Sequence, residues 1–118
     1  MKKERISEVI QEAQDLLTKI SLHDALMQAH DILYASLRNG STIFVCGNGG
    51  SAEQAGHFAG ELVGRFKKER KGIRAIALGM TTAVLTAWSN DHSYETAFAR
   101  EFETIAKTGD ALVVLSTS

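Results

Sequence analysis

The sequence has 118 residues, of which 44% are hydrophobic and 23% charged, a balance typical of one soluble domain with a single core. Thirteen Lys and Arg against fourteen Asp and Glu give a formal net charge of −1, so the basic excess of a protein that binds nucleic acid or an anionic membrane surface is missing. No apolar run reaches the length of a membrane span, and the expected partners are small molecules and further copies of this chain.

The single cysteine, Cys46, cannot form an internal disulfide, which indicates a reducing compartment. The first residues are basic, but Glu4, Glu8, Glu12 and Asp15 soon follow. The segment therefore lacks the uninterrupted apolar core of a secretion signal. We expect a cytoplasmic protein.

Two helices are predicted before any strand. Asn39 and Gly40 are typical of a helix end, and Ser21 with Asp24 three residues later resembles the start of the second helix. We therefore expect helices within residues 1–40 and an α/β core over residues 41–118. The first helix, over residues 4–20, is predicted from apolar residues at helical spacing: Ile6, Val9, Ile10, Ala13, Leu16, Leu17 and Ile20.

A strand, a glycine turn and a helix come next. Residues 42–46 (TIFVC) form a β-branched and aromatic run, and glycines follow directly. Ser51 with Gln54 would form a capping box, so a helix is expected from about Ala52 to Phe66, with a buried face. That face is expected to comprise Ala55, Phe58, Ala59, Leu62 and Val63.

The same pattern then repeats along the chain. A strand is expected at residues 75–78, helical periodicity over 82–87, a helix over 94–107, and a third strand at 111–115. Strands separated by helices pair in parallel through right-handed crossovers. The predicted class is a doubly wound α/β fold, with a parallel sheet covered by helices on both faces.

Ligands of such sheets bind beyond the carboxyl ends of the strands, where the strand order reverses. If the order is two, one, three, this point lies between residues 47–51 and residues 116–118. Glycines allow close approach of backbone N–H groups, a helix start adds positive potential, and the hydroxyls add donors. The crevice suits a phosphorylated polyol.

A nucleotide cofactor is a weaker interpretation of the glycines. Gly47, Gly49 and Ala52 satisfy the G-x-G-x-x-A spacing of dinucleotide sites. The second strand, however, ends in Leu78 and Gly79 without the acidic residue that would hold a ribose. No Gly-Lys-Ser/Thr follows the glycines, which excludes a P-loop.

His57 and Glu61 are four residues apart and should project together from the helix over 52–66. A carboxylate near a helix N-terminal turn and beside a phosphosugar could act as a general base, and the pair could share a divalent metal. Taken alone, such a pair is more often a solvated surface contact. Asn90 and Asp91, at the end of the next helix, are likewise more often a plain cap and turn.

Four segments taken in order carry a family resemblance: CGNGGSAEQAGHFAGELVGRF at 46–66, AIAL at 75–78, SND at 89–91 and GDALVVLSTS at 109–118. Together they resemble the phosphoheptose isomerase branch of the sugar isomerase (SIS) family. The resemblance implies a flavodoxin-like SIS fold without an organic cofactor. It also implies that Glu61 is the catalytic carboxylate, and that His57 and Glu61 are two ligands of a zinc site reported for some members. The phosphosugar ligands it implies are Asn48, Gly49, Gly50, Ser51, Asn90, Asp91, Ser116, Thr117 and Ser118, the last three chiefly at the phosphate.

The family continues past the Ser-Thr-Ser triplet with two more strands and a late helix. That helix carries a Gln and a His that complete the catalytic and metal site. We therefore interpret residues 1–118 as the N-terminal part of a single SIS domain, truncated after its third strand. This segment alone is expected to be inactive.

The implied reaction is the isomerisation of sedoheptulose 7-phosphate to D-glycero-D-manno-heptose 7-phosphate, which feeds heptose and lipopolysaccharide precursor synthesis. A homotetramer is implied as well. One alternative is a non-catalytic SIS protein that binds a replication initiator, which is similar in GNG-S-A and HFA but lacks a carboxylate at the position of Glu61. Another is a sugar-phosphate sensor, which would need an attached DNA-binding domain. The presence of Glu61 favours the enzyme.

Overall fold

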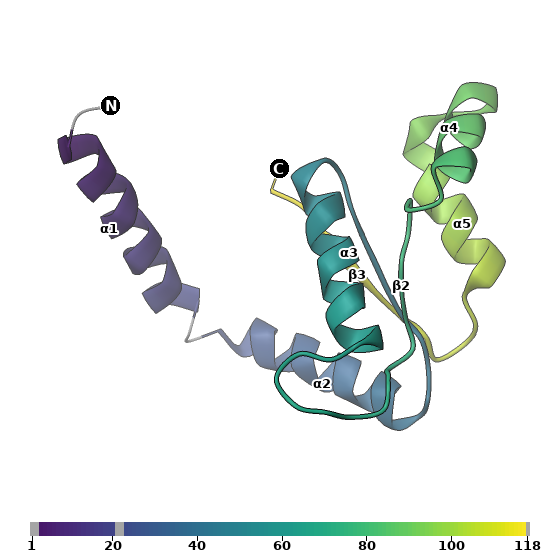
Figure 1. Ribbon diagram of the computed structural model, residues 1–118, viewed down its shortest axis with the longest axis horizontal. Helices are drawn as coiled ribbons and strands as arrows, with labels where there is room; N and C mark the ends of the chain where they lie inside the picture. The colour runs from purple at the N-terminus through teal and green to yellow at the C-terminus, as the bar shows by residue number, and fades with distance from the viewer. Residues whose placement is uncertain (1–2, 21–22, 118) are drawn as a thin grey trace. The chain divides into compact units, whose positions relative to one another are not determined.

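The computed structural model describes residues 3–20 and 23–117, which belong to two compact units, residues 1–32 and 33–118 (Figure 1). Ser21, expected at a helix start, and Ser118, expected at the phosphate, lie outside the described residues. Over the described ranges, no helix is both long enough and apolar enough to cross a membrane.

The first unit consists of α1 (Lys3–Ile20) and the beginning of α2 (Asp24–Arg38). Every residue of α1 is exposed, and the exposed positions include six large apolar residues of the predicted stripe. These are Ile6, Val9, Ile10, Leu16, Leu17 and Ile20. Most of the stability of a helix in a protein comes from packing of its amphipathic face, so this stripe is a surface in need of a partner.

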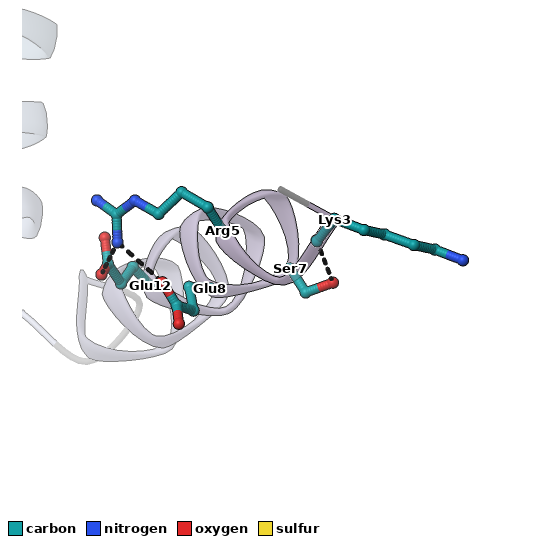
Figure 2. Close-up of polar contacts among 5 residues, drawn as sticks. All are labelled: Lys3, Arg5, Ser7, Glu8 and Glu12. Atoms are coloured by element: carbon teal, nitrogen blue, oxygen red, sulfur yellow. Dashed lines mark hydrogen bonds and ion pairs between the residues drawn. The ribbon is translucent and has the colours of Figure 1, made fainter. Parts of the chain in front are cut away.

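Polar contacts form along the first part of α1 (Figure 2). The guanidinium of Arg5 lies 3.1 Å from the carboxylate of Glu8 and 3.8 Å from that of Glu12, and the hydroxyl of Ser7 donates to the carbonyl of Lys3. Exposed ion pairs of this kind contribute at most about 1 kcal/mol each. They add a little to the stability of the helix, but much less than burial of the apolar stripe would add.

The second unit is built on a parallel sheet in the order β2-β1-β3, which is the order that the predicted crevice required. Its strands are β1 (Ile43–Gly47), β2 (Ala75–Ala77) and β3 (Ala111–Leu115). All of β1 is buried, because it lies between two strands and under both helical layers. Relative to the prediction, β1 is shifted forward by one residue, to include Gly47, and β2 is one residue shorter.

Helices cover both faces of the sheet, as predicted (Figure 1). Alternate residues of β1 point to opposite faces. Ile43 and Val45 pack with α3 (Gly50–Val63) and the end of α2, whereas Phe44 and Cys46 pack with α5 (Ala97–Ile105). The central strand thus shares its side chains between two cores.

The expected capping box at the start of α3 is wrong. The helix begins at Gly50, and its N-cap residue is Gly49, which has a φ of 58° and no side-chain cap. The left-handed turn at Gly49 brings the chain into the helix two residues early, so Ser51 already lies in the first turn and cannot cap it from outside. The helix also ends earlier than expected, at Val63.

The buried face of α3 is narrower than predicted. Ala55 and Ala59 are buried, and Leu62 packs against the core. Phe58 and Val63, which were expected in the same face, are exposed. Ala55 and Ala59 are large enough to fill the space between α3 and the sheet, because the helix starts very close to β1 at Gly47.

The helices after β2 also differ from expectation at their ends. α4 runs over Thr82–Asp91, beyond the predicted 82–87, and carries Asn90 and Asp91 in its last turn. The expected helix over 94–107 begins as a 3-10 turn, η1 (Tyr94–Thr96), and α5 ends at Ile105 because Ala106 is extended.

Asp110 joins the turn before β3 to the start of β1. Its carboxylate accepts hydrogen bonds from the backbone N–H of Thr42 at 2.7 Å and of Lys107 at 2.8 Å. These bonds favour the charged form, and they hold the pKa of Asp110 below its usual range. The carboxylate therefore stabilises the fold only while it is ionised.

We expect Asp110→Asn to lower the melting temperature at neutral pH. Because the folded-state pKa is depressed, the contribution is complete above the unfolded value of about 3.9 and is lost as the pH falls through the folded value. Thermal melts from pH 7 downward should show the parent and Asp110→Asn converging at acid pH. Glu103→Gln, the same loss of charge at an exposed site on α5, is the control. A gap that persists at low pH would contradict this role.

Candidate active site

The carboxyl ends of β1 and β3 are adjacent. Gly47, the last residue of β1, pairs with Leu115, the last residue of β3. Residues 48–51 and 116–117 therefore leave the same edge of the sheet, as expected, and the first turn of α3 begins there. The role of these loops in binding a phosphosugar stays a prediction.

The glycine loop is shaped for an anion. Residues 48–50 are exposed, and the chain turns tightly, with the N–H of Ser51 bonded to the carbonyl of Asn48 and that of Ala52 bonded to Gly49, both at 3.0 Å. The first N–H groups of a helix have no partner within the helix and carry partial positive charge. Because Ser51 and Ala52 already donate to the loop, the N–H groups of Gly49 and Gly50 are the donors that this end of α3 offers to a phosphate.

Asn48 has a partner that the sequence did not reveal. The hydroxyl of Tyr94 donates a hydrogen bond to Asn48 Oδ1 at 2.5 Å. The two residues are 46 positions apart, and neither periodicity nor a local motif signals such a contact. Tyr94 follows α4, so it links the segment that carries Asn90 and Asp91 to the glycine loop.

Asn90 and Asp91 bond to one another, with the amide of Asn90 donating to Asp91 Oδ1 at 3.1 Å. Asp91 also lines a pocket of about 490 Å³ between α4 and α5, together with Trp88 and Arg100. The guanidinium of Arg100 lies 4.7 Å from the centre of the Trp88 ring, a cation–π contact. Asn90 and Asp91 thus lie at the end of α4, and Asp91 lies at the edge of the pocket between α4 and α5.

His57 and Glu61 project together from α3, as predicted. His57 Nε2 and Glu61 Oε1 are 3.0 Å apart, and the side chains are 78% and 35% exposed. They line a pocket of about 290 Å³ with Gln54, Phe58 and Phe66. A general base here would be partly shielded and still open to a ligand.

The expectation that Glu61 lies near a helix N-terminal turn is wrong. Glu61 is in the last turn of α3, eleven residues after Gly50, which places it about 16 Å along the helix axis at 1.5 Å per residue. The glycine loop and Glu61 therefore lie near opposite ends of one helix. The expectation failed because it considered only which face of the helix carries Glu61, and not how far Glu61 lies along the helix axis.

Arg70 anchors the helix end that carries Glu61. Its guanidinium donates to the carbonyl of Glu61 at 2.6 Å and to that of Leu62 at 2.9 Å. A cation at a helix C-terminus also opposes the negative end of the helix dipole. The sequence did not single out Arg70, because it is one of several cations in a loop without a motif.

The chemistry of His57 and Glu61 fits a metal in part. Imidazole nitrogen and carboxylate oxygen are both zinc donors, and side chains four apart on a helix can bind one ion together. Within residues 3–20 and 23–117, however, no cluster of three His, Cys, Asp or Glu side chains is placed to hold a metal. His57 and Glu61 have the chemistry to supply two ligands, and a complete site would need others.

Residues 8–118 match the family described as the SIS domain. The chain belongs to the SIS domain family. This membership accounts for the parallel sheet with helices on both faces. It also agrees with the resemblance noted in the sequence motifs.

Relatives within the SIS family are named phosphoheptose isomerase. One from Helicobacter hepaticus is 50% identical over 109 residues, which are 92% of this chain and 54% of the relative. One from Helicobacter pylori strain P12 is 49% identical over 98 residues, 83% of this chain and 51% of the relative. The chain therefore spans about half the length of these relatives.

Solved structures agree with this placement. A phosphoheptose isomerase structure from Neisseria gonorrhoeae superposes with a TM-score of 0.87 at 33% identity, covering 98% of this chain and 61% of that one. The structure of a phosphoheptose isomerase from Francisella tularensis gives a TM-score of 0.91 at 30% identity, covering 100% and 63%. Both include the two leading helices and the three-stranded sheet.

Proposed function

We propose that the full protein carrying this chain is a phosphosugar isomerase. It converts sedoheptulose 7-phosphate to D-glycero-D-manno-heptose 7-phosphate, for heptose and lipopolysaccharide precursor synthesis, and uses no organic cofactor. The observation that carries the proposal is the combination of a glycine loop at the start of α3 with an oriented carboxylate, Glu61, on the same helix. The names of the relatives support the substrate.

In this reaction the carboxylate of Glu61 takes a proton from carbon 1 of the ketose while the carbonyl oxygen at carbon 2 takes up a proton, and an enediol forms. A proton then adds to carbon 2 while the hydroxyl at carbon 1 gives up its proton and becomes the carbonyl, so the aldose results without any external oxidant. His57 bonds to Glu61 and fixes the direction of its carboxylate. A base that is held in this way loses little orientation entropy on reaching the transition state.

The test is incubation of the purified full-length protein with sedoheptulose 7-phosphate in deuterated water. Formation of a heptose 7-phosphate with deuterium at carbon 2, followed by NMR, is the expected result. Fructose 6-phosphate is the comparison substrate. No conversion of the seven-carbon sugar would reject the proposal, and faster conversion of the six-carbon one would reject the assigned substrate.

We propose that His57 and Glu61 supply two ligands of a zinc site in the full protein. Bound zinc would polarise the substrate carbonyl or organise the site. His57→Ala should lower zinc affinity by more than about tenfold. Replacing a residue that only hydrogen-bonds to a metal ligand already lowers metal affinity by at least that factor. Zinc content after dialysis against a chelator measures this, with His23→Ala in the first unit as control. Equal zinc retention in both variants would contradict the assignment.

We also propose that the protein is a homotetramer. The exposed stripe of α1 is the face for assembly, since homo-oligomers bury such faces in symmetric contacts. The cytoplasm is the proposed location, in keeping with the free, buried thiol of Cys46.

Light scattering of the full protein should give a tetramer, and Leu17→Glu should give smaller species because it places a charge in the stripe. Gln11→Glu, on the face of α1 opposite the stripe, adds the same charge and should leave the tetramer intact. A parent protein that is monomeric in dilute solution would refute the assembly.

A further inference from the structure

We infer that Tyr94 is a positioning residue that fixes the side-chain amide of Asn48 for ligand binding. The inference rests on the proposed function for the identity of the ligand. Its observation is the hydrogen bond from the Tyr94 hydroxyl to Asn48 Oδ1 at 2.5 Å. The bond joins η1 to the exposed glycine loop, two segments that are otherwise separate in the chain.

The aromatic ring that carries the Tyr94 hydroxyl is held in place by its contact with Phe98. The ring of Tyr94 meets that of Phe98 edge to face, with centres 5.9 Å apart and planes at 76°. Phe98 in turn packs on the core cluster of Phe44, Cys46 and Leu78. It also touches Gly79, where an added Cβ would come within 2.6 Å of the Phe98 ring. Tyr94 is itself exposed, but its ring rests on Phe98, which packs on the core.

The bond from Tyr94 decides which group of the Asn48 side-chain amide faces the ligand, because the oxygen and the nitrogen of an amide differ. Its oxygen only accepts hydrogen bonds and its nitrogen only donates, and a half turn of the side chain exchanges the two. Phosphate oxygens are acceptors, so only the nitrogen end is useful beside them. Because Tyr94 occupies the oxygen, the amide presents its two N–H donors to the ligand. Without the hydroxyl, both orientations become available and one of them repels the phosphosugar.

The experiment compares Tyr94→Phe with the parent in the full-length protein. The substitution keeps the ring and its contact with Phe98, and removes only the hydroxyl. A net hydrogen bond corresponds to about a 2- to 12-fold change in an equilibrium constant. We expect Kd and KM for sedoheptulose 7-phosphate to rise by this factor, with a smaller change in kcat and a Tm lowered by no more than the loss of one exposed hydrogen bond. Tyr34→Phe, on α2, is the matched control and should bind as the parent does.

A double-mutant cycle separates positioning from any other role of Tyr94. In an Asn48→Ala background, Tyr94→Phe should weaken binding no further, because no amide remains to be oriented. An equal loss in both backgrounds would overturn the inference, and so would an unchanged Kd in Tyr94→Phe.

The side-chain amide signal of Asn48 in the ligand-free protein gives an independent readout. It should shift in Tyr94→Phe and stay in place in Tyr34→Phe. If the parent fails to bind or convert the sugar, the proposed function fails, while this signal still decides whether Tyr94 orients Asn48. An Asn48 signal that is the same in the parent and in Tyr94→Phe overturns the inference.

Discussion

Glu61→Gln in the full-length protein is expected to lower kcat by about 100- to 10,000-fold, the range for loss of a general acid or base. The amide has the shape of the carboxylate and can keep a hydrogen bond to His57, which lies 3.0 Å away. It cannot take a proton from carbon. Binding of sedoheptulose 7-phosphate should therefore persist with a Kd close to that of the parent.

Steady-state kinetics and calorimetry on the same preparations measure the two quantities separately. Glu103→Gln on α5 makes the same change of group outside the site and should retain the parent rate. Turnover of Glu61→Gln within a few-fold of the parent would remove Glu61 from the role of base. Loss of binding together with rate would instead make Glu61 a binding residue.

The sheet could be predicted from the sequence because its signals are local and repeated. Residues 42–46, 75–78 and 111–115 are short apolar runs separated by helical segments, and only a parallel sheet satisfies that alternation. The strand order was only a condition of the predicted crevice; the structure has that order, β2-β1-β3, and with it the adjacency of the glycine loop to residues 116–117. The pair His57 and Glu61 was found for the same reason, since spacing by four sets a shared direction on a helix.

What could not be predicted depends on contacts between distant residues. The Tyr94 bond to Asn48 and the guanidinium of Arg70 on the carbonyl of Glu61 have no local pattern. The start of α3 was misplaced because a Ser with a Gln three residues later is a common cap, whereas a left-handed glycine can begin a helix without one. Phe58 was placed in the core because it is apolar, although the face of α3 that meets β1 is made by Ala55, Ala59 and Leu62, and Phe58 is exposed.

Gly47→Ala is expected to destabilise the protein and to abolish phosphosugar binding. A Cβ at Gly47 would lie 2.5 Å from the carbonyl carbon and oxygen of Ser51 and 2.7 Å from its Cβ. These atoms belong to the first turn of α3, so the helix start must move away from the sheet. Overpacking of this kind costs about 1–3 kcal/mol in the free energy of unfolding. The shift also carries Ser51 and the loop before it out of line with residues 116–117.

The matched control is Gly60→Ala, in the body of the same helix. An added Cβ there meets no atom within 4 Å, and replacing a helical glycine by alanine should stabilise by about 0.5–1 kcal/mol. Denaturant unfolding of the two full-length variants should therefore move in opposite directions from the parent, and calorimetry should show that only Gly60→Ala still binds the sugar phosphate. If Gly47→Ala unfolds at the parent's denaturant midpoint and keeps its affinity for the sugar phosphate, the close approach of α3 to β1 does not set the shape of the glycine loop.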